Sequence, residues 1–168
     1  MIIRSASAGD AAAIAGVHRA AFPGENEARL VAALHADGDV LASLVADDAG
    51  AVAGHVLFSR MTAYAAGLPI SAASLGPVAV MPQRQHQGIG GQLIDAGLEA
   101  LADLGIELVF VLGDPRYYRR FGFDTETAAP FESPYAGPHL MARWLGTPQA
   151  VDSGHAAYAP AFGRMGSE

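Results

Sequence analysis

A polar, glycine-rich segment between two apolar stretches contains the residues best suited to bind an anion. The segment, residues 83–91, reads QRQHQGIGG; the apolar run LGPVAVMP precedes it and an amphipathic stretch follows it to about residue 105. The first amides of a helix have no partner within the helix and lie at the positive end of its dipole. Gly88, Gly90 and Gly91 lack a Cβ, so phosphate oxygens could approach this backbone closely. The pattern predicts a strand, an anion-binding loop and a helix.

Two common phosphate-binding loops do not fit this segment. The P-loop requires a lysine, and the chain contains none. The dinucleotide fingerprint requires a third glycine where Leu93 stands, although Glu107 lies near the distance expected for a ribose partner. A nucleotide-dependent oxidoreductase is therefore disfavoured. A tight turn without any ligand stays open, because turns use glycine widely.

A third pattern, [QR]-x-x-G-x-[GA] after a strand, matches residues 85–90. It resembles the acetyl-CoA loop of the GNAT N-acetyltransferases. Downstream, residues 112–123 read LGDPRYYRRFGF, in which Tyr118 stands four residues before Gly122-Phe123. This string is similar to one bacterial branch of the same superfamily. The resemblance covers most of the chain and is strongest over residues 75–123.

The resemblance implies a mixed α/β (α+β) fold: a central, mostly antiparallel, splayed sheet with helices on both faces, in one domain over residues 1–168. It also implies acetyl-CoA as cosubstrate and transfer of the acetyl group to a primary amine of a small molecule or peptide. A coenzyme A-binding sensor or interaction module that has lost catalysis is the alternative.

Individual roles follow from the same resemblance. The loop amides would hold the pyrophosphate of coenzyme A, and an amide at Val78 or Val80 would donate to the thioester carbonyl. Tyr118 would protonate the departing thiolate; Tyr117 could take that role, but the spacing favours Tyr118. The residues implied in coenzyme A binding are Val78, Ala79, Val80, Gln85, His86, Gln87, Gly88, Ile89, Gly90, Gly91, Gly113 and Tyr117.

The general base is left open by the sequence. Many GNAT enzymes place a glutamate on the fourth strand, whereas this chain has no acidic residue between positions 64 and 80. Glu25, Glu27 and His55 remain alternatives, the histidine because of its pKa range. The acceptor pocket is expected from residues 20–30, 60–70 and 125–140, which carry little pattern.

Two further groups of polar residues bear on ligand binding. Four arginines within or beside the motifs could contact phosphates of coenzyme A; they are Arg84, Arg116, Arg119 and Arg120. Four histidines share no metal-ligand spacing, so no metal site is predicted; they are His18, His35, His139 and His155.

Hydrophobic periodicity places these residues on a series of short elements. Helices are expected after Ser7, after Glu25 and from about Gly88. The last of these would bury Ile89, Leu93, Gly97, Leu101 and Leu104. Strands are expected over 1–4, 41–46, 52–64, 68–80, 107–112 and 139–145, with a last strand or extended tail over 155–162 and loops after 123.

Two details of the strands can be predicted as well. Alternation over 52–64 places Val52, Gly54, Val56 and Phe58 on one face. Pro77 cannot donate to a ladder, so we expect a bulge or separation from the next strand there.

Composition excludes several classes of function. The chain has 168 residues, 51% of them hydrophobic, and a formal net charge of −7. This charge argues against a nucleic-acid partner and would favour a cationic substrate. Cysteine is absent, which removes thiol nucleophiles and disulfides. No signal peptide or membrane-spanning run is recognised, so a cytoplasmic protein without a membrane partner is expected; a homodimer is left open.

Overall fold

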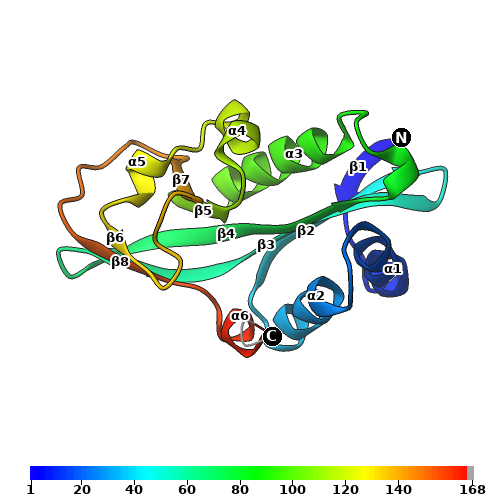
Figure 1. The fold of residues 1–168 in the computed structure, drawn as a ribbon, viewed down its shortest axis with the longest axis horizontal. Helices are drawn as coiled ribbons and strands as arrows, with labels where there is room; N and C mark the ends of the chain where they lie inside the picture. The colour runs from blue at the N-terminus through cyan, green and yellow to red at the C-terminus, as the bar shows by residue number, and fades with distance from the viewer. Residues whose placement is uncertain (166–168) are drawn as a thin grey trace.

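The computed structural model describes residues 1–165, whose strands form one sheet with helices on both faces (Figure 1). The strands are β1 Ile2–Ser5, β2 Val40–Asp48, β3 Ala51–Ala65, β4 Leu68–Val80, β5 Leu108–Leu112, β6 Phe131–Glu132, β7 Leu140–Trp144 and β8 Gly154–Ala157. The helices are α1 Ala11–Ala21, α2 Asn26–Ala36, α3 Ile89–Asp103, α4 Pro115–Tyr118, α5 Thr125–Ala128 and α6 Pro160–Met165.

The sheet is mostly antiparallel, as expected. Its main path runs β1-β2-β3-β4-β5-β7, and β8 joins the far end of β3 with β6 beside it. Only the pairs β4–β5 and β6–β8 are parallel within the described residues. Because β3 is long, it pairs with β2 along its first half and with β8 at residues 62–65.

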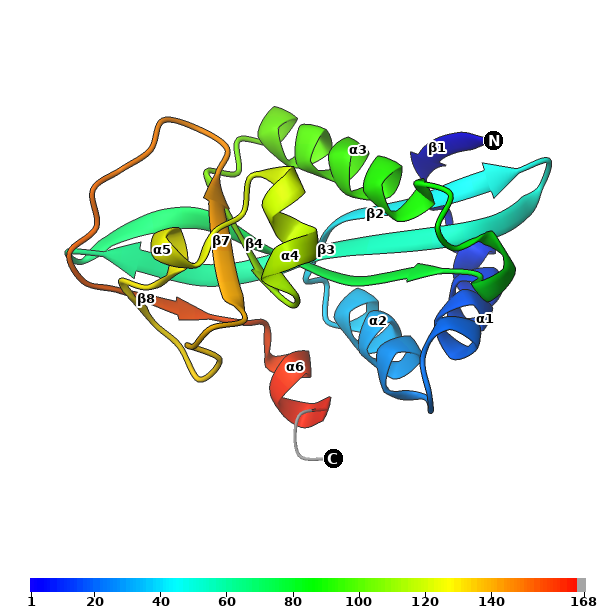
Figure 2. The ribbon, with the colours of Figure 1, turned by 45° about the horizontal axis from the view of Figure 1, so that its top comes forward.

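The two faces of the sheet are covered by different helices. Figure 2 shows α3 and α4 along one face, with α1, α2 and α6 on the other. Alternation on β3 explains the separation: Val56 and Phe58 pack under α3, whereas Leu57 packs with residues of α1 and α2. Val52 was predicted to share the face of Phe58, but it packs on the opposite side. The pairing register shifts at Ala53, and this extra residue reverses the alternation.

Helix α3 begins directly after the glycine loop. Gly88 caps it in a left-handed conformation (φ 83°), which glycine adopts without strain. Gly97 allows the helix to approach the sheet, since a Cβ there would overlap the ring of Phe58. Leu104 was predicted on the buried face, but it is 61% exposed because the helix ends at Asp103 and the chain turns away.

The sheet opens between β4 and β5. Residues 72–75 of β4 pair with residues 108–111 of β5, but β4 continues to Val80 without this partner. On the other side, Gly76 and Pro77 form a bulge against Leu57 of β3. The irregularity expected at Pro77 and the splay implied by the resemblance are both confirmed.

The C-terminal region is more structured than the sequence suggested. Residues 155–162 were predicted as a strand or an extended tail, but β8 is followed by α6, whose first residue is Pro160. Proline suits that position because its ring already has a helical φ and no amide is needed. The region expected to be loops contains α5, capped by the Asp124 carboxylate accepting from the Thr127 amide at 2.7 Å. In the described part of the chain, no helix combines the length and hydropathy needed to span a membrane.

Candidate active site

The end of β4 presents backbone amides away from its neighbour β3. The Met81 amide donates to the Ala53 carbonyl at 2.9 Å, so this pair is of the hydrogen-bonded type. Such pairs alternate along an antiparallel ladder. The amide of Ala79 therefore faces β3, whereas those of Val78 and Val80 face the side that β5 has left. These two amides are available to a ligand.

A first hollow, here the loop cavity, lies at the start of α3. It has a volume of about 610 Å³, within the range of small-molecule sites. The Gln85 side-chain amide donates to the Val80 carbonyl at 3.1 Å and so ties the loop to the strand end. The cavity is lined by Val80, Arg84, Gln85, His86, Gly88, Ile89, Gly90, Gly91, Tyr117, Arg120 and Phe121.

Two of the four arginines border the loop cavity. Arg84 pairs with Asp48 at 2.6 Å, and Arg120 donates to the Tyr117 carbonyl at 3.0 Å. The guanidinium of Arg120 also lies 4.7 Å from the centre of the Tyr117 ring. Arg116 instead contacts Asp114 at 3.4 Å, and Arg119 is not among the residues that line the loop cavity. The loop cavity thus combines helix N-terminal amides with two cations, which suits a phosphate-containing ligand.

A second hollow, here the splay cavity, lies where β4 and β5 separate. Its volume is about 530 Å³. Residues from both ends of the chain meet there, although more than 130 positions separate Phe22 from Tyr158. It is lined by Phe22, Asn26, Glu27, Leu30, Leu75, Gly76, Pro77, Val78, Leu112, Tyr118, Tyr135, Tyr158 and Phe162.

The two neighbouring tyrosines of α4 face different cavities. The Tyr117 hydroxyl would lie 3.3 Å from a Cβ on Gly90, beside the loop. Tyr118 lines the splay cavity, and its ring packs against Gly113. Burial, with a smaller contribution from Tyr117, raises the pKa of Tyr118 to about 12, so its hydroxyl is protonated at neutral pH. Burial also raises the pKa of Tyr117.

Three residues implied in coenzyme A binding lie outside both cavities. Ala79 is 2% exposed and faces the core. Gln87 accepts a hydrogen bond from Arg84 at 3.4 Å, and Gly113 supports the Tyr118 ring. The other implied residues line one cavity or the other, with Val78 in the splay cavity.

The three alternatives for the general base are placed very differently. Glu25 precedes α2 and pairs with Arg19 at 2.7 Å on the surface. His55 is fully buried on β3 and lines neither cavity. Glu27, from the first turn of α2, lines the splay cavity together with Tyr118.

The buried His55 belongs to a short chain of hydrogen-bonding groups. Its Nδ1 lies 2.8 Å from His18 Nε2, and its Nε2 lies 2.8 Å from Ser43 Oγ. Burial lowers the pKa of His18 to about 4 and, together with the neighbouring His18, lowers that of His55 to about 3. Both imidazoles are therefore neutral at physiological pH. Within the described residues, no cluster of three or more histidine, aspartate or glutamate side chains could hold a metal ion.

The regions expected to form the acceptor pocket contribute unequally. The region 20–30 contributes Phe22, Asn26, Glu27 and Leu30 to the splay cavity. The region 125–140 contributes Tyr135, and no residue of 60–70 is in the described lining. Sequence reasoning missed Tyr158 and Phe162, and no local signal could have identified them. Both residues line the cavity because β8 pairs with β3, so the chain that follows β8 lies on this side of the sheet.

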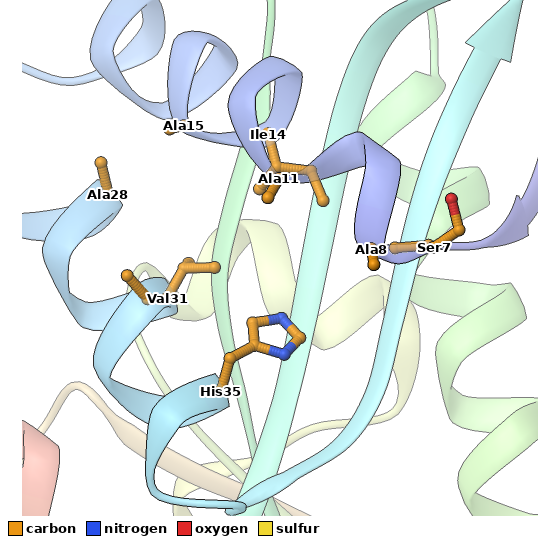
Figure 3. A pocket seen from close by; sticks show the side chains of 10 residues that line it. Ser7, Ala8, Ala11, Ile14, Ala15, Ala28, Val31 and His35 are labelled. Atoms are coloured by element: carbon orange, nitrogen blue, oxygen red, sulfur yellow. The ribbon is translucent and has the colours of Figure 1, made fainter.

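A third hollow, of about 570 Å³, lies between α1 and α2 (Figure 3). It contains none of the predicted site residues, and most of its lining is alanine and aliphatic side chains such as Ile14 and Val31. His35 is its one imidazole among the described residues. Its lining within the described part of the chain includes no strand residue and no tyrosine, both of which line the splay cavity.

Comparison with known protein families shows the class of protein to which this chain belongs. The family model of the acetyltransferase (GNAT) domain matches residues 2–125. The chain therefore belongs to the GNAT family of N-acetyltransferases.

Particular relatives agree with this assignment. The chain is 38% identical over 151 residues to the protein named uncharacterized N-acetyltransferase YhbS of Escherichia coli K12, covering 89% of this chain and 84% of the relative. The crystal structure of E. coli YhbS in complex with CoA matches with a TM-score of 0.87 and 31% identity, over 97% of this chain and 92% of that one. A GNAT acetyltransferase of Brucella melitensis, solved in complex with acetyl-CoA, matches with a TM-score of 0.79 and 36% identity, over 96% and 97% of the two chains.

Proposed function

We propose that the protein binds acetyl-CoA across the two cavities and transfers the acetyl group to a primary amine of a small molecule or peptide. The observation that carries the proposal is the position of residues 78–80 of β4. Val78 lines the splay cavity and Val80 lines the loop cavity, and both amides face the side without β5. An extended ligand could run along these amides as an added strand does. The complexes of the two relatives with CoA and acetyl-CoA support this ligand.

The same arrangement suits the chemistry of acyl transfer. With the pyrophosphate at the start of α3, the thioester would lie near Val78, whose amide would donate to the carbonyl oxygen as negative charge develops there. The amine nitrogen forms the new C–N bond, and the C–S bond breaks with its electron pair moving to sulfur. The Tyr118 hydroxyl, protonated and lining the splay cavity, would donate a hydrogen bond to the departing thiolate.

Calorimetry and thiol release together test the proposal. We expect acetyl-CoA to bind, NAD and ATP not to bind, and thiol to be released from acetyl-CoA when amines are supplied. Binding of acetyl-CoA without release for any amine would support the non-catalytic alternative. Binding of NAD in place of acetyl-CoA would contradict the assignment of the loop.

Gly90→Val adds a mutational test of the loop cavity. Its branched side chain would stand beside the Tyr117 hydroxyl, where the phosphates approach, and should weaken acetyl-CoA binding at least tenfold with little change in Tm. Gly146→Val is the matched control, because a Cβ at that exposed position meets nothing within 4 Å. Equal acetyl-CoA affinity in both variants would mean that the loop is only a turn.

A further inference from the structure

The lining of the splay cavity has a distinct chemistry. Within residues 1–165, Glu27 is the only charged side chain that lines it. Five aromatic side chains surround the remaining space: Phe22, Tyr118, Tyr135, Tyr158 and Phe162. The Tyr158 ring meets Tyr135 and Phe162 edge to face, each with centroids 5.0 Å apart. A single carboxylate among aromatic faces is complementary to one positive charge.

Two residues that line this cavity each carry a polar atom without a hydrogen-bond partner among residues 1–165. Glu27 Oε1 and the Tyr158 hydroxyl are both shielded from solvent, and neither makes a hydrogen bond with residues 1–165. Buried polar groups are almost always paired. Two unpaired atoms on residues that line one cavity therefore favour a ligand whose binding supplies the missing contacts. Burial raises the pKa of Tyr158, so its hydroxyl is neutral and can donate or accept.

A protonated amine meets these requirements better than other ligands do. Its N–H groups can donate to the Glu27 carboxylate and to the Tyr158 oxygen, and its charge is attracted by the aromatic faces. An anionic group would be repelled by Glu27. A polyamine would bring further charges to a lining in which, among the described residues, Glu27 is the one carboxylate. The formal charge of −7 would also favour the approach of cations.

We propose that the splay cavity binds a primary ammonium group carried on an apolar or aromatic chain, and that the Glu27 carboxylate binds this ammonium and accepts its proton. The inference deepens the proposed function and rests on it. One proton moves from the ammonium nitrogen to Glu27, which frees the lone pair that attacks the thioester carbonyl. The nitrogen loses its second proton as the C–S bond breaks, and that proton neutralises the thiolate. The products are the amide, coenzyme A as its thiol, and a proton that Glu27 returns to solvent.

The decisive variant is Glu27→Gln, with Glu25→Gln as its matched control. Glutamine keeps the size of the side chain and removes its charge. Glu25 lies two residues earlier at the surface and pairs with Arg19, so its substitution changes the net charge equally without touching the cavity. Thiol release is measured with 2-phenylethylamine, n-hexylamine, spermidine and 2-phenylethanol, and acetyl-CoA affinity is measured by calorimetry.

We expect the two monoamines to be acetylated in preference to spermidine, and 2-phenylethanol not to react. Glu27→Gln should lower kcat/KM for the monoamines by about 10²-fold or more, the range for loss of a general base, with acetyl-CoA affinity unchanged. At higher pH, Glu27→Gln should recover activity in proportion to the neutral amine, up to a pH of about 10. A merely structural role for Glu27 would not produce this recovery. Glu25→Gln should match the parent protein.

The contrary outcomes separate the two levels of the proposal. If monoamines are acetylated and Glu27→Gln keeps the kcat/KM of the parent, the inference on Glu27 is wrong and the proposed function stands. If spermidine is preferred over both monoamines, the assignment of the substrate class is wrong. If acetyl-CoA binds but no amine promotes thiol release, the proposed function fails and the inference fails with it.

Discussion

Tyr118→Phe is the substitution that tests the proposed leaving-group chemistry most directly. The pKa of Tyr118 is raised to about 12, mainly by burial. An ordinary thiol has a pKa of about 8.5, so that of Tyr118 is about 3.5 units higher. Complete transfer of the tyrosine proton to a thiolate is therefore unfavourable at neutral pH. The hydroxyl would act chiefly by donating a hydrogen bond to the negative charge that develops on sulfur.

The size of the effect follows from that interaction. A hydrogen bond to a charged group contributes about 1.5–3 kcal/mol, and about 1.4 kcal/mol changes a rate tenfold. Tyr118→Phe should therefore lower kcat about 10- to 150-fold. Affinity for acetyl-CoA should change little, because the thiolate is absent from the bound ground state. The phenylalanine ring keeps the packing against Gly113.

The assay is steady-state thiol release from acetyl-CoA, with Tyr117→Phe as the control. Tyr117 places its hydroxyl beside Gly90 in the loop cavity, so its loss should change acetyl-CoA affinity rather than kcat. The parent should show no alkaline decline in kcat attributable to Tyr118 up to a pH of about 10. Equal and small decreases in kcat for both variants would refute the reasoning, because water would then donate the hydrogen bond to the thiolate. A large decrease in kcat for Tyr117→Phe alone would mean that Tyr117, and not Tyr118, interacts with the thiolate.

Two further predictions concern stability. Gly97→Ala should lower the free energy of unfolding by about 1–3 kcal/mol, because its Cβ would overlap the Phe58 ring. Gly16→Ala should raise the free energy of unfolding by about 0.4–1 kcal/mol, since a Cβ there meets nothing within 4 Å. Urea denaturation compares the two variants. Equal effects would contradict the close contact between Gly97 and the Phe58 ring. Stability should also fall as the pH decreases from 6.5 to about 4, because burial lowers the pKa of His18 to about 4 and of His55 to about 3, and the unfolded chain then binds more protons. Urea denaturation at several pH values measures this, and a free energy of unfolding that is constant over that interval would rule it out.

Local features of the sequence determined the order and type of most elements. Apolar runs with turn residues between them predicted the strands from β1 to β5, and the glycine loop predicted the start of α3. These features act over a few residues, so they can be recognised without the rest of the fold. Tyr118, which the resemblance singled out, lies on α4, which begins three residues after the end of β5. Motifs of the same local kind suggested the family, and the match of its family model to residues 2–125 shows the membership.

The wrong predictions concern residues whose burial depends on a neighbouring element of the fold. Val52 lies opposite its predicted face because a bulge in the pairing with β2 adds one residue. Leu104 continues the apolar pattern of α3 but extends past the part of the helix that covers the sheet, so it is exposed. The periodicity of a segment does not reveal where its partner ends.

The proposed acceptor side of the site depends on the tertiary structure. Glu27 was one of three alternatives for the base, and only the fold brings it into one cavity with Tyr118 and Val78. Tyr158 carried no recognisable signal, and it reaches this cavity because β8 pairs with β3 about 90 residues earlier in the chain. A glycine loop binds through its own backbone, so short-range sequence can reveal it. A pocket formed by side chains from distant segments exists only after those segments pack together, and its chemistry follows from that packing.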